Sequence, residues 1–258
     1  MSAITLETAD GVAILTLARP DKLNALTDAM IGEFGAALDE IARSDASVVV
    51  LTGAGRGFCA GFDLSLAGED AGGDEGYWAA RQERFGGLVT RLRALPQPVI
   101  AAVNGAAAGA GLGLALACDT RLGSTQARFS SAFIRVGVSS CDVGVSYLLP
   151  RAIGATRAFE MMLTGRMVES EEAERIGLIL SRVAPEALMG EALALARAMA
   201  DNGRLGLWMT KRGMWANLEA GSLQAAIELE NRTQSFMIGA GGLARRAAAR
   251  GFVRPKAP

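Results

Sequence analysis

The chain contains no histidine among its 258 residues. This absence excludes Ser-His-Asp and Cys-His nucleophilic catalysis, histidine general-base chemistry and zinc sites built on imidazole. Any proton that this protein moves must therefore be carried by a carboxylate, a lysine, a tyrosine, a cysteine or water.

Lysine is scarce, and the charges balance. Only Lys22, Lys211 and Lys256 occur, and the formal net charge is −1. Strong binding to nucleic acid needs a cluster of cations along the phosphate backbone, and anionic lipid attracts basic segments. We therefore expect neither a nucleic-acid partner nor a membrane partner.

Cysteines and long apolar stretches are also few. Cys59, Cys118 and Cys141 are odd in number and lack zinc-site spacing, which fits a reducing compartment and predicts no metal site. No run approaches the roughly 20 apolar residues that span a bilayer. The first residues lack the basic and apolar stretches of a secretory signal. We expect a cytoplasmic protein.

Strand and helix patterns divide the chain into two parts. The predicted strands cover residues 4–8, 12–18, 48–52 and 99–103. Asp10-Gly11 between the first two strands predicts a hairpin, and Thr27 begins a helical pattern. From residue 154 onward strand signals nearly vanish, and helical patterns follow one another. The patterns predict an α/β core with a largely parallel sheet over residues 1–195, and a helical region over residues 196–258.

Two glycine-rich turns, residues 53–63 and 104–113, are the most informative feature of the chain. Each follows a short apolar run, and the second lies at the start of a predicted helix. Such turns present bare backbone N–H groups, and two of these aimed at one point stabilise an oxyanion. This arrangement suggests chemistry on a carbonyl compound.

Other glycine-rich sites fit these turns less well. Phe58 stands where a dinucleotide-binding fingerprint has its third glycine, and the second turn misses that glycine as well. No Gly-Lys-Ser/Thr follows either turn, so a P-loop is excluded. The glycines could instead serve only to let helices pack closely.

The chain resembles the crotonase superfamily, also called the enoyl-CoA hydratase/isomerase family. Five stretches match, in family order. They are RPDKLNAL (19–26), FCAGFDL (58–64), residues 102–119 beginning with AVNG, residues 144–154 beginning with GVSYLLPR, and residues 165–178. Each stretch alone is a weak signal, but five in register are specific.

The resemblance implies an α/β spiral of repeated ββα units with a helical C-terminal trimerisation region, and a trimer or a dimer of trimers. It implies an acyl-CoA substrate and no cofactor besides the CoA of that substrate. The family's oxyanion-hole amides fall on Phe62 and Ala110. The positions that contact substrate in the family correspond to Lys22, Ala25, Ala60, Asp63, Leu64 and Gly109. For Lys22, a solvated surface charge is an alternative.

Departures from the family pattern concern the two glutamates that activate water in its hydratases. They align with Gly113 and Phe133, neither of which moves a proton. Asp142, the only carboxylate between Asp119 and Glu160, is the remaining candidate, and its neighbours are apolar. Family isomerases carry a carboxylate at this place. Alternatively, Asp142 caps a helix that starts near Gly144; capping would lower its pKa, whereas burial would raise it.

One carboxylate beside an oxyanion hole favours a double-bond isomerase, with Asp142 as acid and base. A hydratase that uses Asp142, or a non-catalytic acyl-CoA-binding protein, remains an alternative, and Tyr147 is a backup proton donor. Residues 65–76 are predicted to form a loop that shapes the acyl pocket together with the helix that contains Trp78. The aromatic candidates for that pocket, each of which could instead belong to the core, are Phe62, Trp78, Phe129, Phe133 and Tyr147.

Overall fold

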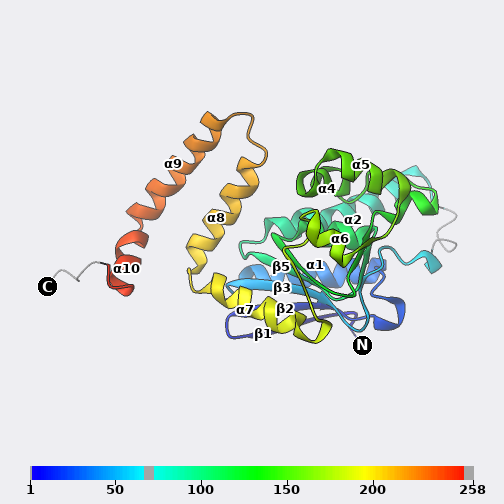
Figure 1. Ribbon diagram of the computed structural model, residues 1–258, viewed down its shortest axis with the longest axis horizontal. Helices are drawn as coiled ribbons and strands as arrows, with labels where there is room; N and C mark the ends of the chain where they lie inside the picture. The colour runs from blue at the N-terminus through cyan, green and yellow to red at the C-terminus, as the bar shows by residue number, and fades with distance from the viewer. Residues whose placement is uncertain (1, 67–72, 253–258) are drawn as a thin grey trace. The chain divides into compact units, whose positions relative to one another are not determined.

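Six strands form the larger of two β-sheets in the computed structural model, which describes residues 2–66 and 73–252 (Figure 1). In order across the sheet they are β1 (Ile4–Ala9), β2 (Val12–Leu17), β3 (Val48–Gly53), β5 (Val99–Val103), β7 (Thr120–Ser124) and β10 (Ser181–Val183). All neighbours are parallel except β1 and β2, which form the predicted hairpin. Its turn residues, Asp10 and Gly11, have φ angles of 51° and 73°, as a two-residue hairpin turn requires.

Four shorter strands form the second sheet of the described residues. In order they are β4 (Gly57–Cys59), β6 (Ala106–Ala108), β8 (Arg128–Ser130) and β9 (Val168–Glu169). The first three are parallel, and β9 is antiparallel to β8. The expectation that strands nearly vanish after residue 154 is wrong for β9 and β10. Strands of two or three residues carry no readable alternation, because pairing with their neighbours sets their extended form.

Three strand–strand–helix units repeat along the chain. Each unit sends its first strand to the larger sheet and its second strand to the smaller one: β3 and β4 precede α2, β5 and β6 precede α3, and β7 and β8 precede α4. This repeat confirms the expected α/β spiral of ββα units. The α-helices described up to residue 200 are α1 (Asp28–Arg43), α2 (Glu75–Ala94), α3 (Ala110–Ala117), α4 (Val145–Ile153), α5 (Ala155–Thr164), α6 (Ser170–Arg175) and α7 (Leu188–Ala200).

The core lies between the larger sheet and its helices. Every residue of β3 and β5 is buried, as expected for parallel strands that are covered on both faces. Helix α7 packs on β2, β3, β5 and β7, and α1 to α5 contact one another in sequence order. Helix α1 begins as predicted, because the Thr27 hydroxyl accepts a hydrogen bond from Met30 N at 3.2 Å.

Main-chain atoms of the two glycine-rich segments come into direct contact. A Cβ on Gly111 would lie 2.0 Å from the carbonyl oxygen of Cys59, and a Cβ on Gly61 would lie 2.8 Å from that of Ala108. Gly61 also has a φ of +96°, which L side chains rarely adopt. These glycines therefore permit close packing, here of α3 against β4 and of Gly61 against β6 rather than of one helix against another.

The chain divides into two compact units, Met1–Asp201 and Asn202–Pro258. The predicted boundary at residue 195 falls inside α7. The second unit contains α8 (Arg204–Asn217), α9 (Leu223–Gly239) and α10 (Gly242–Ala249). The Asn217 side chain donates to Glu230 Oε1 at 3.0 Å and thereby joins α8 to α9. The trimerisation role of this unit stays a prediction.

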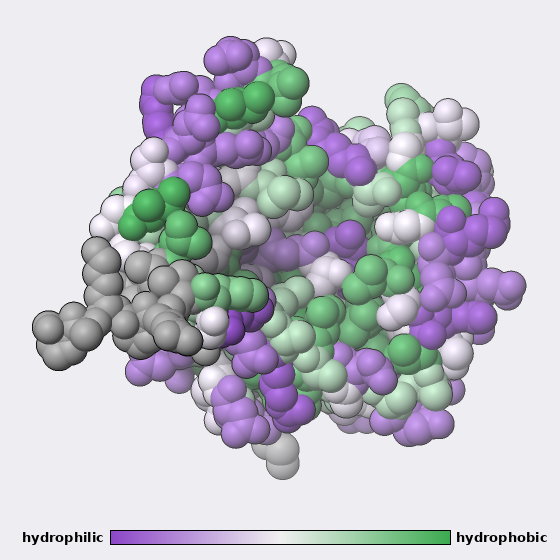
Figure 2. Space-filling model, turned by 60° about the vertical axis from the view of Figure 1, so that its left-hand side comes forward, coloured by the Kyte–Doolittle hydropathy of each residue, from purple (hydrophilic) through white to green (hydrophobic). Residues whose placement is uncertain are grey.

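Hydrophobic residues are exposed on the second unit, among them Phe236 and Leu243. Figure 2 shows hydrophobic and hydrophilic residues interspersed on one face of the molecule. No helix within residues 2–66 and 73–252 combines the length and apolarity needed to cross a membrane. Of the loop predicted at residues 65–76, positions 67–72 lie outside the described residues.

The contact at Gly111 generates a prediction about stability. Gly111→Ala inserts a methyl group against a backbone oxygen that cannot move aside, so the free energy of unfolding should fall by about 3 kcal/mol or more. The matched control is Gly32→Ala in α1, where nothing lies within 4 Å of the added Cβ. This control should gain about 0.5–1 kcal/mol, because alanine is the better helix former. Urea unfolding measures both values, and equal losses in the two variants would contradict the proposed contact.

Candidate active site

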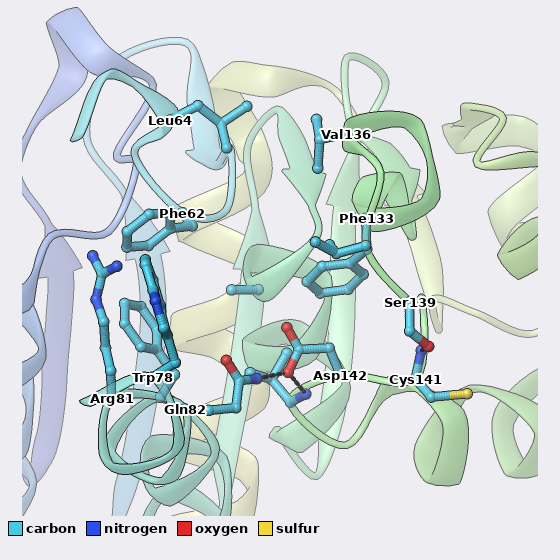
Figure 3. Close-up of a pocket in the computed structure, with 14 residues that line it drawn as sticks. Phe62, Leu64, Trp78, Arg81, Gln82, Phe133, Val136, Ser139, Cys141 and Asp142 are labelled. Carbon is cyan, nitrogen blue, oxygen red and sulfur yellow. Dashed lines mark hydrogen bonds between the residues drawn. The ribbon is translucent and has the colours of Figure 1, made fainter. Parts of the chain in front are cut away.

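A cavity of about 490 Å³ lies in the first unit, between α2 and the segment that follows β8 (Figure 3). Its lining is mostly apolar. The lining residues are Phe62, Leu64, Trp78, Arg81, Gln82, Phe85, Ala110, Phe133, Val136, Val138, Ser139, Cys141, Asp142 and Val143. An apolar hollow with a few polar groups is typical of a small-molecule site.

The smaller sheet delivers the predicted catalytic residues to this cavity. Phe62 follows β4, Ala110 follows β6, and both Phe133 and Asp142 follow β8. Because β4, β6 and β8 are parallel neighbours, their carboxyl ends meet at one edge of the sheet. Residues that lie up to 80 positions apart in the sequence are thus brought to one place.

The Phe62 and Ala110 segments touch. A Cβ on Gly61 would lie 3.4 Å from Ala110 N. Phe62 pairs with Leu26 in an isolated parallel β-bridge. Its hydrogen bonds are made by the residues on either side of Phe62: Gly61 O accepts from Leu26 N, and Asp63 N donates to Leu26 O. The N–H of Phe62 itself therefore points away from Leu26. Ala110 is the first residue of α3, so its N–H has no acceptor within the helix. The positive φ of this turn, +53°, falls on Gly109 and leaves Ala110 helical.

Asp142 is half-buried and accepts two hydrogen bonds on one oxygen. Val143 N donates to Oδ1 at 2.7 Å, and the Gln82 side-chain amide donates to the same atom. Burial raises the pKa of Asp142 above its usual value, against the bond from Val143, which lowers it. Helix α4 starts at Val145 after Gly144, with no side-chain cap. The alternative that Asp142 caps this helix is therefore wrong.

The two positions that align with the hydratase glutamates hold no carboxylate, and their surroundings are filled. A Cβ on Gly113 would lie 2.7 Å from Val143 Cγ2 and 3.0 Å from the Val143 carbonyl oxygen. Val143 itself has a φ of +38°, which is strained for a β-branched residue. Phe133 lines the cavity with its ring. Among the described lining residues, Asp142 is the only carboxylate.

Helix α2 supplies one wall of the cavity, as expected of the helix that contains Trp78. Four lining residues of this helix lie three or four positions apart or next to one another and so share one face: Trp78, Arg81, Gln82 and Phe85. The Arg81 guanidinium lies over the Phe62 ring, 4.3 Å from its centroid, and its Nη2 is 2.9 Å from Asp28 Oδ2. The helical spacing was visible in the sequence, but nothing in it told which face borders a cavity.

The predicted pocket aromatics divide into two groups. Phe62, Trp78 and Phe133 line the cavity. Phe129 is fully buried in β8 and belongs to the core. Tyr147 stacks with Arg151, whose Cζ lies 3.5 Å from the ring centroid, and does not line the cavity.

Of the residues expected to contact substrate, Leu64 lines the cavity. The others do not border it; they are Lys22, which is exposed, and Ala25, Ala60, Asp63 and Gly109. Asp63 accepts hydrogen bonds from Ser65 and pairs with Arg19 at 3.0 Å, and these contacts lower its pKa, the Ser65 bond most strongly.

Asn24 gives the motif at residues 19–26 a structural role. It is fully buried, and its side chain accepts from Arg19 N at 2.8 Å. Its amide donates to the carbonyl oxygens of Ala54 and Gly57, at 3.0 and 2.8 Å. A single side chain thus fastens the first glycine-rich turn to the end of β2. Within the part of the chain that the structure describes, no three Cys, Asp or Glu side chains gather as metal ligands would.

The chain is similar to known proteins over most of its length. The family model described as enoyl-CoA hydratase/isomerase matches residues 7–241. A protein of Mycobacterium tuberculosis named probable enoyl-CoA hydratase is 44% identical over 231 residues, which cover 88% of this chain and 81% of that protein. The 1,2-epoxyphenylacetyl-CoA isomerase of Escherichia coli is 40% identical over 226 residues, which cover 87% and 86%.

A solved structure shares the fold over almost the whole chain. The probable enoyl-CoA hydratase/isomerase of Mycobacterium abscessus superposes with a TM-score of 0.88 at 39% identity, covering 97% of this chain and 96% of that one. The crotonase-type fold expected from the motifs is thereby confirmed. The chain belongs to the enoyl-CoA hydratase/isomerase family of acyl-CoA enzymes.

Proposed function

We propose that this protein is a double-bond isomerase that converts a 3-enoyl-CoA thioester into the 2-enoyl-CoA thioester. Asp142 is the single acid and base, and the N–H groups of Phe62 and Ala110 form the oxyanion hole. The observation that carries the proposal is one cavity that is lined by both of these residues and, among the described lining residues, by one carboxylate.

The reaction needs one base and one pair of donors. The Asp142 carboxylate removes a proton from the α carbon, C2, and the electron pair of that C–H bond forms a C1–C2 double bond. The pair of the thioester C=O bond moves to the oxygen, where two preorganised N–H groups stabilise the resulting dienolate. The protonated Asp142 then gives its proton to the γ carbon, C4: the C3–C4 pair forms the new C–H bond, the C1–C2 pair becomes the C2–C3 double bond, and the thioester carbonyl is restored. Atoms and electrons balance without any cofactor beyond the CoA of the substrate.

The surroundings of Gly113 and Phe133 disfavour hydration by two glutamates. Val143 occupies the space beside Gly113, and the Phe133 ring is apolar. Water held there would lack the polar partners that an ordered water needs. A hydratase that relies on Asp142 alone, or a protein that binds acyl-CoA without turnover, is an outcome of the experiment below.

Removal of the Asp142 carboxylate should abolish isomerisation. Asp142→Asn keeps the size of the side chain but cannot take a proton, so turnover of a 3-enoyl-CoA should fall by roughly a thousandfold or more. The matched control is Glu186→Gln, an exposed carboxylate outside the cavity, which should leave the rate unchanged. Formation of the conjugated thioester in deuterated water measures both the rate and the carbon that receives the proton.

Three outcomes of this experiment would overturn the proposal. Rapid hydration of a 2-enoyl-CoA that Asp142→Asn leaves intact would point to a hydratase with other groups. Hydration that is lost in Asp142→Asn, without isomerisation, would identify a hydratase that uses Asp142. Calorimetric binding without any turnover would identify a non-catalytic acyl-CoA-binding protein.

The raised pKa of Asp142 predicts how stability depends on pH. Because burial disfavours the charged carboxylate in the folded state, ionisation of Asp142 lowers stability. This loss is absent below the usual carboxyl pKa, about 3.9, and complete above the raised value in the folded protein. Asp142→Asn carries no charge, so it should melt at a higher temperature than the unmodified protein at pH 7. The difference should vanish as the pH falls toward 4, and a lower melting temperature of the variant at pH 7 would contradict the argument.

A further inference from the structure

The geometry points to Gln82 as the residue that positions the Asp142 carboxylate, so that one oxygen, Oδ2, exchanges the proton with the substrate. This inference rests on the acid/base role proposed above for Asp142. It assigns a function to a side chain of α2 that belongs to none of the motifs of the chain.

Gln82 is the uncharged polar member of the α2 face that borders the cavity. Trp78 lies one turn before it and Phe85 almost one turn after it, and both side chains line the same cavity. The Gln82 Nε2 donates to Asp142 Oδ1 across the cavity floor (Figure 3).

Both donors act on the same oxygen of Asp142. Val143 N binds Oδ1 at 2.7 Å, and the Gln82 amide binds it as well. Figure 3 shows both bonds ending on one oxygen, while the other oxygen points toward the open part of the cavity below Phe133. An oxygen that accepts two hydrogen bonds is the less basic of the pair, so the proton goes to Oδ2.

A lone acid/base has to reach two carbons, because it removes the proton from one and returns it to the other. The terminal torsion of an aspartate is broad, so a carboxylate held by one backbone donor can rotate. A second donor from another helix fixes its plane and keeps Oδ2 directed at the substrate. Misplacement of a reacting group by about 1 Å can cost roughly a hundredfold in rate.

An uncharged donor suits this task. The other titratable groups among the described lining residues are Arg81 and Cys141. The guanidinium of Arg81 is paired with Asp28, which also pairs with Arg84, so Asp28 compensates part of the charge of Arg81. Gln82 therefore orients the carboxylate without adding a charge that would hold Asp142 ionised through the whole reaction.

The test removes the donor and keeps the bulk. Gln82→Leu and Gln82→Met both lack the amide, and both residues are good helix formers. The pKa of the Asp142 carboxyl group is measured in the free protein from the NMR chemical shift of its carboxyl carbon. The values of kcat and KM are measured for the 3-enoyl-CoA. The matched control is Gln126→Leu, the same substitution at an exposed position outside the cavity.

In both Gln82 variants we expect the Asp142 pKa to rise by roughly half a unit to one unit, because a hydrogen bond to the charged form is lost. We expect kcat to fall by roughly ten- to a hundredfold with little change in KM. Gln126→Leu should change neither. An effect confined to Gln82→Leu would reflect side-chain shape and would overturn the inference.

Failure of the inference and failure of the proposed function give different results. An Asp142 pKa and a kcat that stay unchanged in both Gln82 variants, while the unmodified enzyme isomerises its substrate, would overturn the inference alone. Absence of isomerisation in the unmodified enzyme would overturn the proposed function, and with it the role of Gln82, whatever the pKa.

Discussion

Direct contact between the main chains of the two glycine-rich segments is the constraint on which the site depends. No side chain fits between Gly111 and the Cys59 carbonyl, or between Gly61 and the Ala108 carbonyl. These contacts hold the short strands β4 and β6 together and bring the residues that follow them, Phe62 and Ala110, to one cavity. The missing side chains of these glycines therefore allow the close approach that brings both residues to the cavity.

The missing side chain at position 113, which the resemblance aligns with a hydratase glutamate, affects how Asp142 is held. Because Gly113 has no side chain, Val143 can pack against α3, with a φ of +38°. Val143 is also the backbone donor to Asp142 Oδ1. A glutamate at position 113 would displace the residue that holds Asp142 in place. The missing side chain at position 113 thus makes room for the residue that donates to Asp142.

Local signals predicted the parts of the fold that local interactions determine. Asp10-Gly11 sets its hairpin and Thr27 begins its helix through contacts within a few residues. The short strands of the smaller sheet were missed because their form depends on pairing between distant segments. For the site, motif resemblance indicated Phe62, Ala110 and Asp142, which the structure brings to one cavity. Gln82 carried no signal, because its importance depends on a partner 60 positions later in the chain.

Opposing effects on one carboxylate suit a group that takes a proton and gives it back. Burial beside aromatic walls raises the pKa of Asp142, which makes it a stronger base than an exposed carboxyl. Unopposed, the same burial would disfavour the ionised form, which is the form that accepts a proton. Hydrogen bonds from Val143 and Gln82 favour the anion again, and because both act on Oδ1 they leave Oδ2 basic. An acid/base of this kind must be ionised before the reaction and basic during it. Both donors bind Oδ1, which favours ionisation, whereas the apolar walls around Oδ2 keep that oxygen basic. A carboxylate whose two oxygens were equally solvated could not meet both requirements.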